Sequence, residues 1–100
     1  MQIHIESPHW QLSETQEEMI RQKFDTLAKM FRRIESCDIV VKKEKNDQQK
    51  EYFIEGKLQV PRRTLFSSEQ AETFEIAIEK LLTDLEHRLR RYKEELEEIR

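Results

Sequence analysis

Hydrophobic and polar residues alternate in four short segments of the chain, and a period of two is typical of β-strands that bury one face. These segments lie at about residues 2–6, 36–45, 51–60 and 64–68. In the second segment, Cys37, Ile39 and Val41 share one face. In the third, one face carries Tyr52, Ile54, Gly56, Leu58 and Val60. The alternation therefore predicts four strands with an inward apolar face.

Two longer segments repeat hydrophobic residues at spacings of three and four, which predicts amphipathic helices. The first runs from about Glu14 to Arg32, and Ser13 and Gln16 before and within it have the spacing of a capping box. The second runs from about Ala71 to Glu98, roughly 40 Å at 1.5 Å per residue. Because that length exceeds a small sheet, we expect its last turns, with their basic residues, to project past the strands.

Turns separate these elements and define their order. Pro8 ends the first strand, the polar run 46–50 predicts a hairpin, and Pro61-Arg62-Arg63 predicts a second turn. A β-α-β unit makes the first two strands parallel, and hairpins make the others antiparallel. We therefore predict an α+β fold of order β-α-β-β-β-α, a four-stranded mixed sheet with two helices packed on one face.

Composition limits the cellular setting and the number of domains. With 100 residues, the chain is expected to form a single domain, 1–100, ordered over about 1–97. The N-terminus lacks a signal-peptide pattern, and no apolar run is long enough to span a membrane. One cysteine, Cys37, suits a reducing compartment and a buried position. We expect a cytoplasmic protein without a membrane partner.

Residues for catalysis or metal binding are not arranged in any known pattern. A single glycine excludes a glycine-rich phosphate loop, and His4, His9 and His87 lack ligand spacing with one another or with Cys37. No nucleophile–base pair is visible. We therefore expect no enzyme activity, no catalytic residues, no metal, no cofactor and no small-molecule substrate. Trp10 is expected to pack against the core or the sheet edge, whereas Phe53, on the open sheet face, is a candidate contact residue.

Positive charge is clustered, although the formal net charge is -3. The stretch from Arg88 to Lys93 contains no acidic residue and is followed by a glutamate-rich end. RNA affinity comes mainly from neutralising phosphates, and duplex RNA is recognised by shape and backbone. The candidate RNA-binding residues are Lys23, Lys29, Arg32, Arg33, Arg62, Arg63, Arg88, Arg90, Arg91 and Lys93. The alternative is a solvated surface with helical ion pairs, for which Glu86 and Arg90 have suitable spacing.

The order of elements and several short segments resemble a known family, the ribosome hibernation promoting factors, also called ribosome-associated inhibitor or sigma-factor modulation proteins. The resemblance extends from Met1 to about Leu96. It rests on His9 and on segments 23–34, 44–46, 58–61, 65–66, 69–71, 74–75 and 89–94. It implies a short-form protein that binds small-subunit rRNA in the mRNA and tRNA cleft, inhibits translation and promotes hibernation. Short forms usually depend on a separate partner for ribosome dimerisation.

Departures from the family pattern change its basic surface. Ser7-Pro8 replaces a common Gly-Arg, Thr26 replaces a lysine, and Asp84 stands where a basic residue is frequent. Arg62-Arg63 stands in place of a glycine pair and partly compensates. Two other functions remain open, a non-ribosomal RNA-binding module and a protein-interaction domain of the same fold. RNA binding predicts steep salt dependence, whereas protein docking predicts sensitivity to apolar changes at Phe53 or Leu96.

Overall fold

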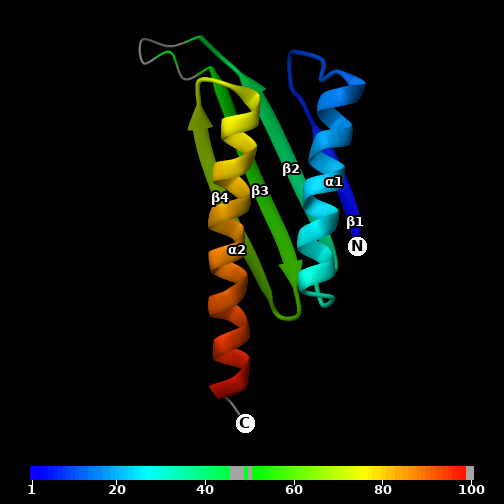
Figure 1. Cartoon of the computed structure of the whole chain (residues 1–100), viewed down its shortest axis with the longest axis vertical. Coiled ribbons are helices and arrows are strands. Elements are labelled where there is room, and N and C mark those ends of the chain that lie inside the picture. The colour runs from blue at the N-terminus through cyan, green and yellow to red at the C-terminus, as the bar shows by residue number, and fades with distance from the viewer. Residues whose placement is uncertain (46–48, 50, 99–100) are drawn as a thin grey trace.

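The computed structural model of the chain describes residues 1–45, 49 and 51–98. Its elements, in chain order, are β1 (Gln2–Glu6), α1 (Glu14–Met30), β2 (Ser36–Lys43), β3 (Tyr52–Val60), β4 (Arg63–Ala71) and α2 (Phe74–Glu98). The order β-α-β-β-β-α is the predicted one (Figure 1). The hairpin predicted at 46–50 falls mostly outside the described residues.

The sheet has the strand order β1-β2-β3-β4. β1 runs parallel to β2, with Ile3 beside Cys37, and the other two strand pairs are antiparallel. Both helices cover the same face of the sheet and point in the same direction (Figure 1). The predicted α+β fold with a mixed sheet and two helices on one face is therefore confirmed.

Helix α1 begins where the capping box predicted. The Ser13 hydroxyl accepts a hydrogen bond from the Gln16 amide at 3.1 Å, and the Gln16 side chain accepts one from the Ser13 amide at 3.0 Å. These bonds satisfy two backbone donors that a helix start leaves free. At the other end Phe31 is the C-cap residue, so the helix stops two residues before the predicted Arg32. Arg32 and Arg33 consequently lie in the loop that follows α1.

β4 is longer than the predicted segment 64–68. Glu69, Gln70 and Ala71 extend it because they pair with the far end of β3. Polar Glu and Gln have low strand propensity, but pairing with a neighbouring strand decides their conformation. The turn before β4 is shorter than predicted, since Arg63 already pairs with Val60 and leaves only Pro61 and Arg62 in the loop. Because Ala71 still pairs with Tyr52 in the sheet, α2 begins at Phe74 and not at Ala71.

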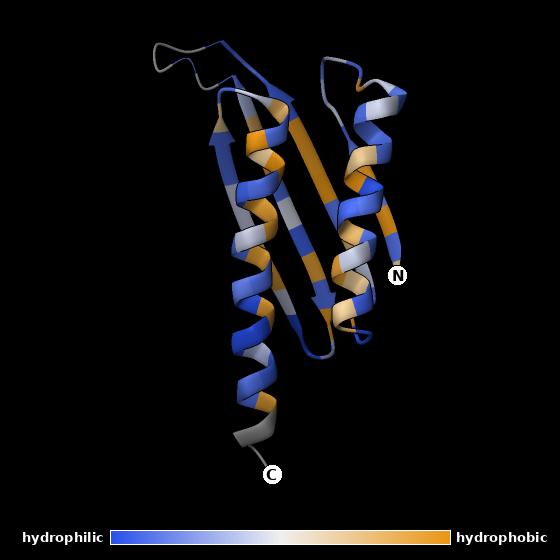
Figure 2. Cartoon of the chain, viewed as in Figure 1, coloured by the Kyte–Doolittle hydropathy of each residue, from blue (hydrophilic) through white to orange (hydrophobic). Residues whose placement is uncertain are grey.

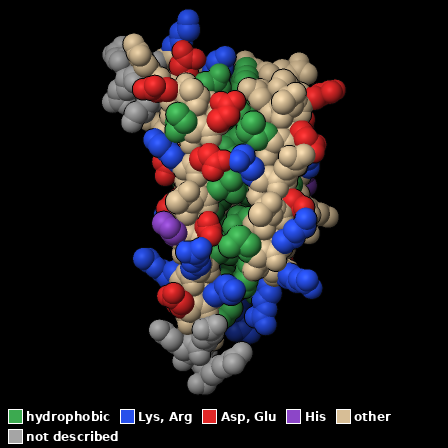
Figure 3. Space-filling model, in the orientation of Figure 1, with side chains coloured by type: hydrophobic (Ala, Val, Ile, Leu, Met, Phe, Trp, Pro, Cys, Tyr) green, Lys and Arg blue, Asp and Glu red, His purple; other side chains and the backbone are tan. Residues whose placement is uncertain are grey.

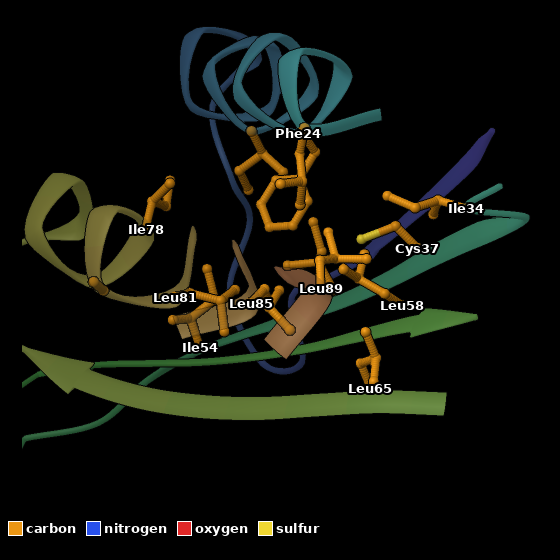
Figure 4. Close-up of a cluster of buried hydrophobic side chains, with 14 of the residues drawn as sticks. Phe24, Ile34, Cys37, Ile54, Leu58, Leu65, Ile78, Leu81, Leu85 and Leu89 are labelled. Atoms are coloured by element: carbon orange, nitrogen blue, oxygen red, sulfur yellow. The ribbon is translucent and has the colours of Figure 1, made fainter. Parts of the chain in front are cut away.

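The hydrophobic core lies between the helix layer and the sheet (Figures 2 and 4). Phe24, Ile54, Leu58, Leu81 and Leu85 are fully buried there. The α2 helix comes so close to β3 that a Cβ added to Gly56 would lie 3.0 Å from Leu85 Cδ1. Cys37 is also buried, as predicted, and burial raises the pKa of its thiol to about 12.

The prediction that the basic run of the last helix projects past the sheet was wrong. Leu89 and Tyr92, within that run, are each only 3% exposed, and the Tyr92 hydroxyl donates to the Pro61 carbonyl at 2.8 Å. The longer β4 and the tight turn before it extend the sheet as far as Tyr92. Only the final turns of α2 pass the end of the strands (Figure 1). No helix among the described residues is both long and apolar enough to cross a membrane.

Candidate nucleic-acid interface

The C-terminal ends of both helices and the β3–β4 turn meet at one end of the molecule. The rings of Phe31, at the end of α1, and Tyr92, on α2, pack edge to face with centroids 5.8 Å apart. The Tyr92 hydroxyl also bonds the turn through Pro61. Three segments far apart in the sequence are thereby held together by packing, so any charges they carry have fixed relative positions.

Nine of the chain's 18 lysines and arginines lie on these three segments. We call this group the basic end; its members are Lys29, Arg32, Arg33, Arg62, Arg63, Arg88, Arg90, Arg91 and Lys93. Figure 3 shows Lys and Arg side chains gathered over the lower part of the helix layer. Helix C-termini carry a partial negative charge, which favours cations nearby. Part of this clustering is therefore explained by helix stability alone.

Four cations of the basic end have acidic partners. Arg90 bonds Glu86 at 2.8 Å, as its spacing predicted, and Arg88 bonds Asp84 at 3.1 Å. Lys29 lies 3.4 Å from Asp25, and Arg63 pairs with Glu95 from the last turns of α2. Exposed pairs of this kind contribute at most about 1 kcal/mol to stability. They do, however, lower the positive charge available to an external anion.

The other five cations form no ion pair with any of residues 1–45, 49 and 51–96: Arg32, Arg33, Arg62, Arg91 and Lys93. All five are exposed. The Lys93 ammonium lies 5.5 Å from the centroid of the Phe31 ring, a cation–π contact that orients it without neutralising it. These five residues give the basic end its free positive charge.

Arg62 has an unusual backbone conformation. Its φ is 67°, in the left-handed region that favours glycine, and it follows Pro61 in the two-residue turn. Its neighbour Arg63 stacks on Tyr92, with the guanidinium carbon 5.4 Å from the ring centroid. One arginine is thus held against the protein while the other is presented to solvent.

Lys23 does not belong to the basic end, although the sequence placed it among the candidates. It lies in the middle of α1 and pairs with Glu79 of α2 across the helix layer. This contact joins residues 56 positions apart in the sequence. Its partner leaves Lys23 less able than the five free cations to neutralise a phosphate.

Asp84, one of the departures from the family pattern, faces the buried hydroxyl of Ser67. The pKa of the Asp84 carboxyl is lowered, first by that hydroxyl and then by hydrogen bonding and charge from Arg88. The carboxylate is therefore ionised at neutral pH and offsets the charge of Arg88. Asp84 therefore places a negative charge beside the basic end, at a position where the family resemblance led us to expect a basic residue.

The two aromatic residues considered as contact residues, Trp10 and Phe53, have different surroundings. The Trp10 indole donates to the Val41 carbonyl at 2.9 Å and packs edge-on to Tyr52, which confirms its predicted packing role. Phe53 is half-buried on the open sheet face, away from the helix layer. The aromatic pair of Phe31 and Tyr92, which positions Lys93 and Arg63, was not predicted from the sequence. Their place at the ends of two apolar stripes was the available signal.

The described residues do not form a metal-binding cluster. His4 lies 3.2 Å from Asp38 on the open sheet face, outside any cluster of ligands. Over residues 1–45, 49 and 51–98, no three histidine, cysteine or acidic side chains are placed to share a metal ion. The basic end is an exposed cationic surface on three segments that packing holds together, and such a surface suits the backbone of a folded nucleic acid.

Two solved structures share the fold of this chain. A ribosomal subunit interface protein from Coxiella burnetii superposes with a TM-score of 0.83 at 16% identity, covering 93% of this chain and 98% of that one. The N-terminal domain of Protein Y from Thermus thermophilus gives 0.77 at 14% identity, covering 92% and 99%. No curated protein matches the sequence.

The sequence itself matches one family model, described as sigma 54 modulation protein / S30EA ribosomal protein, over residues 3–97. That span includes β1 from its second residue, the whole of α1, β2, β3 and β4, and all but the last residue of α2. The chain therefore belongs to the sigma 54 modulation protein / S30EA ribosomal protein family, whose members are ribosome-associated modulation proteins and not enzymes.

Proposed function

We propose that the chain binds the rRNA of the small ribosomal subunit in the mRNA and tRNA cleft and inhibits translation in idle ribosomes. It would act by occupying the cleft, without turnover. Ribosome association is a property of its family, and the site on the subunit is the new element of the proposal. Pairing of ribosomes is left to a separate dimerising factor.

The observation that carries the proposal is the group of five cations at the basic end that have no ion-pair partner among residues 1–45, 49 and 51–96. They project from three segments that Phe31, Tyr92 and Pro61 hold together. Because the three segments are held together, the backbone positions of these cations are fixed before binding, and each cation that reaches a phosphate releases a counterion. Folded rRNA offers phosphates at fixed spacing, so a rigid set of cations can match it.

The size of the effect follows from the number of contacts. If all five unpaired cations reach phosphates, the slope of log K against log salt is about -3.5 to -4.5. Raising salt from about 50 to about 200 mM should then weaken binding roughly 100- to 500-fold. A protein that docks on ribosomal proteins through apolar contacts would show a much smaller change.

Co-sedimentation with purified small subunits tests the proposal. The double variant Arg62→Glu/Arg91→Glu should lose binding, because it reverses two free charges on different segments. The matched control is Lys57→Glu/Lys80→Glu, which makes the same change in net charge at exposed positions away from the basic end. An equal loss of binding in both variants would mean that only the net charge matters and not the basic end. Failure of the natural protein to sediment with small subunits at low salt would contradict ribosome binding.

Occupation of the cleft needs its own readout. Bound protein should exclude mRNA and initiator tRNA from the small subunit and should inhibit translation in a reconstituted system. Simultaneous binding of protein, mRNA and tRNA at full occupancy would place the protein elsewhere on the subunit. A high-affinity RNA ligand outside the ribosome would instead favour the alternative RNA-binding module.

A further inference from the structure

β4 forms one edge of the sheet, and its outer side has no neighbouring strand. It is nine residues long, whereas β1 at the opposite edge has five. A long edge strand carries a row of backbone donors and acceptors that can pair with another strand. Proteins usually protect such edges with proline, bulges or charged side chains.

The hairpin geometry shows which backbone groups point outward. Pro61 and Arg62 form a two-residue turn, so Val60 and Arg63 close the hairpin as a hydrogen-bonded pair. Every second residue from Arg63 therefore bonds to β3. The residues between them direct their amides and carbonyls away from the sheet: Thr64, Phe66, Ser68 and Gln70. In agreement, the Gln70 carbonyl accepts a hydrogen bond from Lys80 at 3.4 Å on that outer side.

Little protects this edge. The segment from Thr64 to Ser68 has no charged residue and no proline. In the described part of the chain, Lys80 is the one side chain that bonds the outward backbone of β4, and it does so at the end near Gln70. Phe66 is 44% exposed, on the open face of the sheet. The middle of the edge is thus uncharged and accessible.

The strand is complementary to itself in one antiparallel register. If a two-fold axis passes through Phe66, then Phe66 faces its own copy and Thr64 faces Ser68. In the same register Arg63 and Glu69 are paired positions on the helix side, which places opposite charges across the pair. Within its own copy Arg63 already pairs with Glu95, so Glu69 of the second copy would add a second carboxylate near its guanidinium. An axis through Thr64 or Ser68 separates the two phenylalanines and also loses the charge pair.

The neighbouring helix adds a second complementary feature. Asp84 of α2 lies beside Ser67, next to the axis, and Arg88 bonds Asp84 at 3.1 Å. In an antiparallel pair of copies, the α2 helices also run antiparallel on either side of the axis. The carboxylate of one copy can then face the guanidinium of the other.

We propose that the chain forms a homodimer in which two β4 strands pair antiparallel about Phe66, joining two four-stranded sheets into one of eight strands. The charges favour a second copy as the partner, because opposite charges at positions related by a two-fold axis match an identical strand. The inference does not depend on ribosome binding, since the paired edge is formed by β4 and not by the free cations of the basic end.

Sedimentation equilibrium from micromolar to millimolar concentration tests the dimer. Phe66→Lys should raise the dissociation constant at least about tenfold, because two like charges then oppose each other at the axis. Met30→Lys is the matched control, since Met30 is 53% exposed on α1 and away from the edge. A monomeric natural protein, or equal effects of the two lysines, would overturn the proposal.

Cysteine cross-linking tests the register, with native Cys37 left in place because it is buried. Under mild oxidation Phe66→Cys should form a disulfide between copies, because paired residues at the axis lie within the usual Cα separation. Ser68→Cys alone should not cross-link, whereas a mixture of Ser68→Cys and Thr64→Cys should. Cross-linking of Ser68→Cys alone, with none for Phe66→Cys, would place the axis elsewhere and refute the proposed register.

Discussion

Arg62 occupies a turn position where glycine would be less strained, and its side chain has no ion-pair partner among the described residues. Such an outlier suggests a residue kept for function at some expense of stability. Replacing it with glycine should therefore separate the two properties. Arg62→Gly is expected to stabilise the fold and to weaken binding to the small subunit.

The expected gain in stability follows from the backbone angle of 67°. A non-glycine residue in the left-handed region costs about 1–2 kcal/mol. Glycine loses more chain entropy on folding, which removes about 0.5–1 kcal/mol of that gain. The net increase in unfolding free energy is about 0.5–1 kcal/mol, which corresponds to a rise in Tm of roughly 2–8 °C for a domain of this size.

The expected loss in binding follows from one phosphate contact. Removing it should reduce the magnitude of the salt slope by about 0.7–0.9. Thermal unfolding and co-sedimentation at several salt concentrations measure both effects on the same preparation. Arg62→Lys is the control, because it keeps both the charge and the strained backbone and should resemble the natural protein in both assays.

Two results would refute this reasoning separately. If Arg62→Gly is no more stable than the natural protein, the turn does not strain Arg62. If it is more stable but binds with unchanged affinity and salt slope, Arg62 does not contact rRNA and its positive φ has no connection with binding.

Four further outcomes follow from the structure. Asp84→Asn should bind the subunit roughly two- to tenfold more tightly, because it frees Arg88 for a phosphate. The pKa of Asp84 is lowered on folding from its ordinary value of 3.8, so the carboxylate stabilises the folded protein at pH values above 3.8. As the pH falls below that value, the natural protein should lose this stabilisation, whereas Asp84→Asn has none to lose. Tyr92→Phe should lose about 1 kcal/mol in denaturant unfolding, because the bond to Pro61 disappears. Cys37 should resist alkylation at pH 8 until the protein unfolds, because the pKa of its buried thiol is about 12.

Local patterns were sufficient to predict the elements of the fold. Alternation around Ile39 and the apolar stripe through Leu85 each reflect burial of a single face, and burial of that kind is visible in a single sequence. The end of β4 was not visible in the same way. Gln70 and Ala71 are in a strand because Phe53 and Tyr52 pair with them, and this pairing joins residues far apart in the chain.

The candidate site was predictable as a set of residues but not as a set of charges. The pair of Glu86 and Arg90 follows from helical spacing. The pairs of Lys23 with Glu79 and of Arg63 with Glu95 depend on how separate elements pack, so their neutralising effect appears only in the folded chain.

Photo-cross-linking tests most directly whether the basic end contacts small-subunit rRNA. A photo-reactive side chain is introduced in place of Glu94, which is exposed beside Lys93, or in place of Lys57 on the open sheet face. We predict that position 94 cross-links to rRNA nucleotides of the mRNA and tRNA cleft and that position 57 gives much less RNA product. Cross-links to rRNA from position 57 alone, or from position 94 to ribosomal proteins alone, would contradict it.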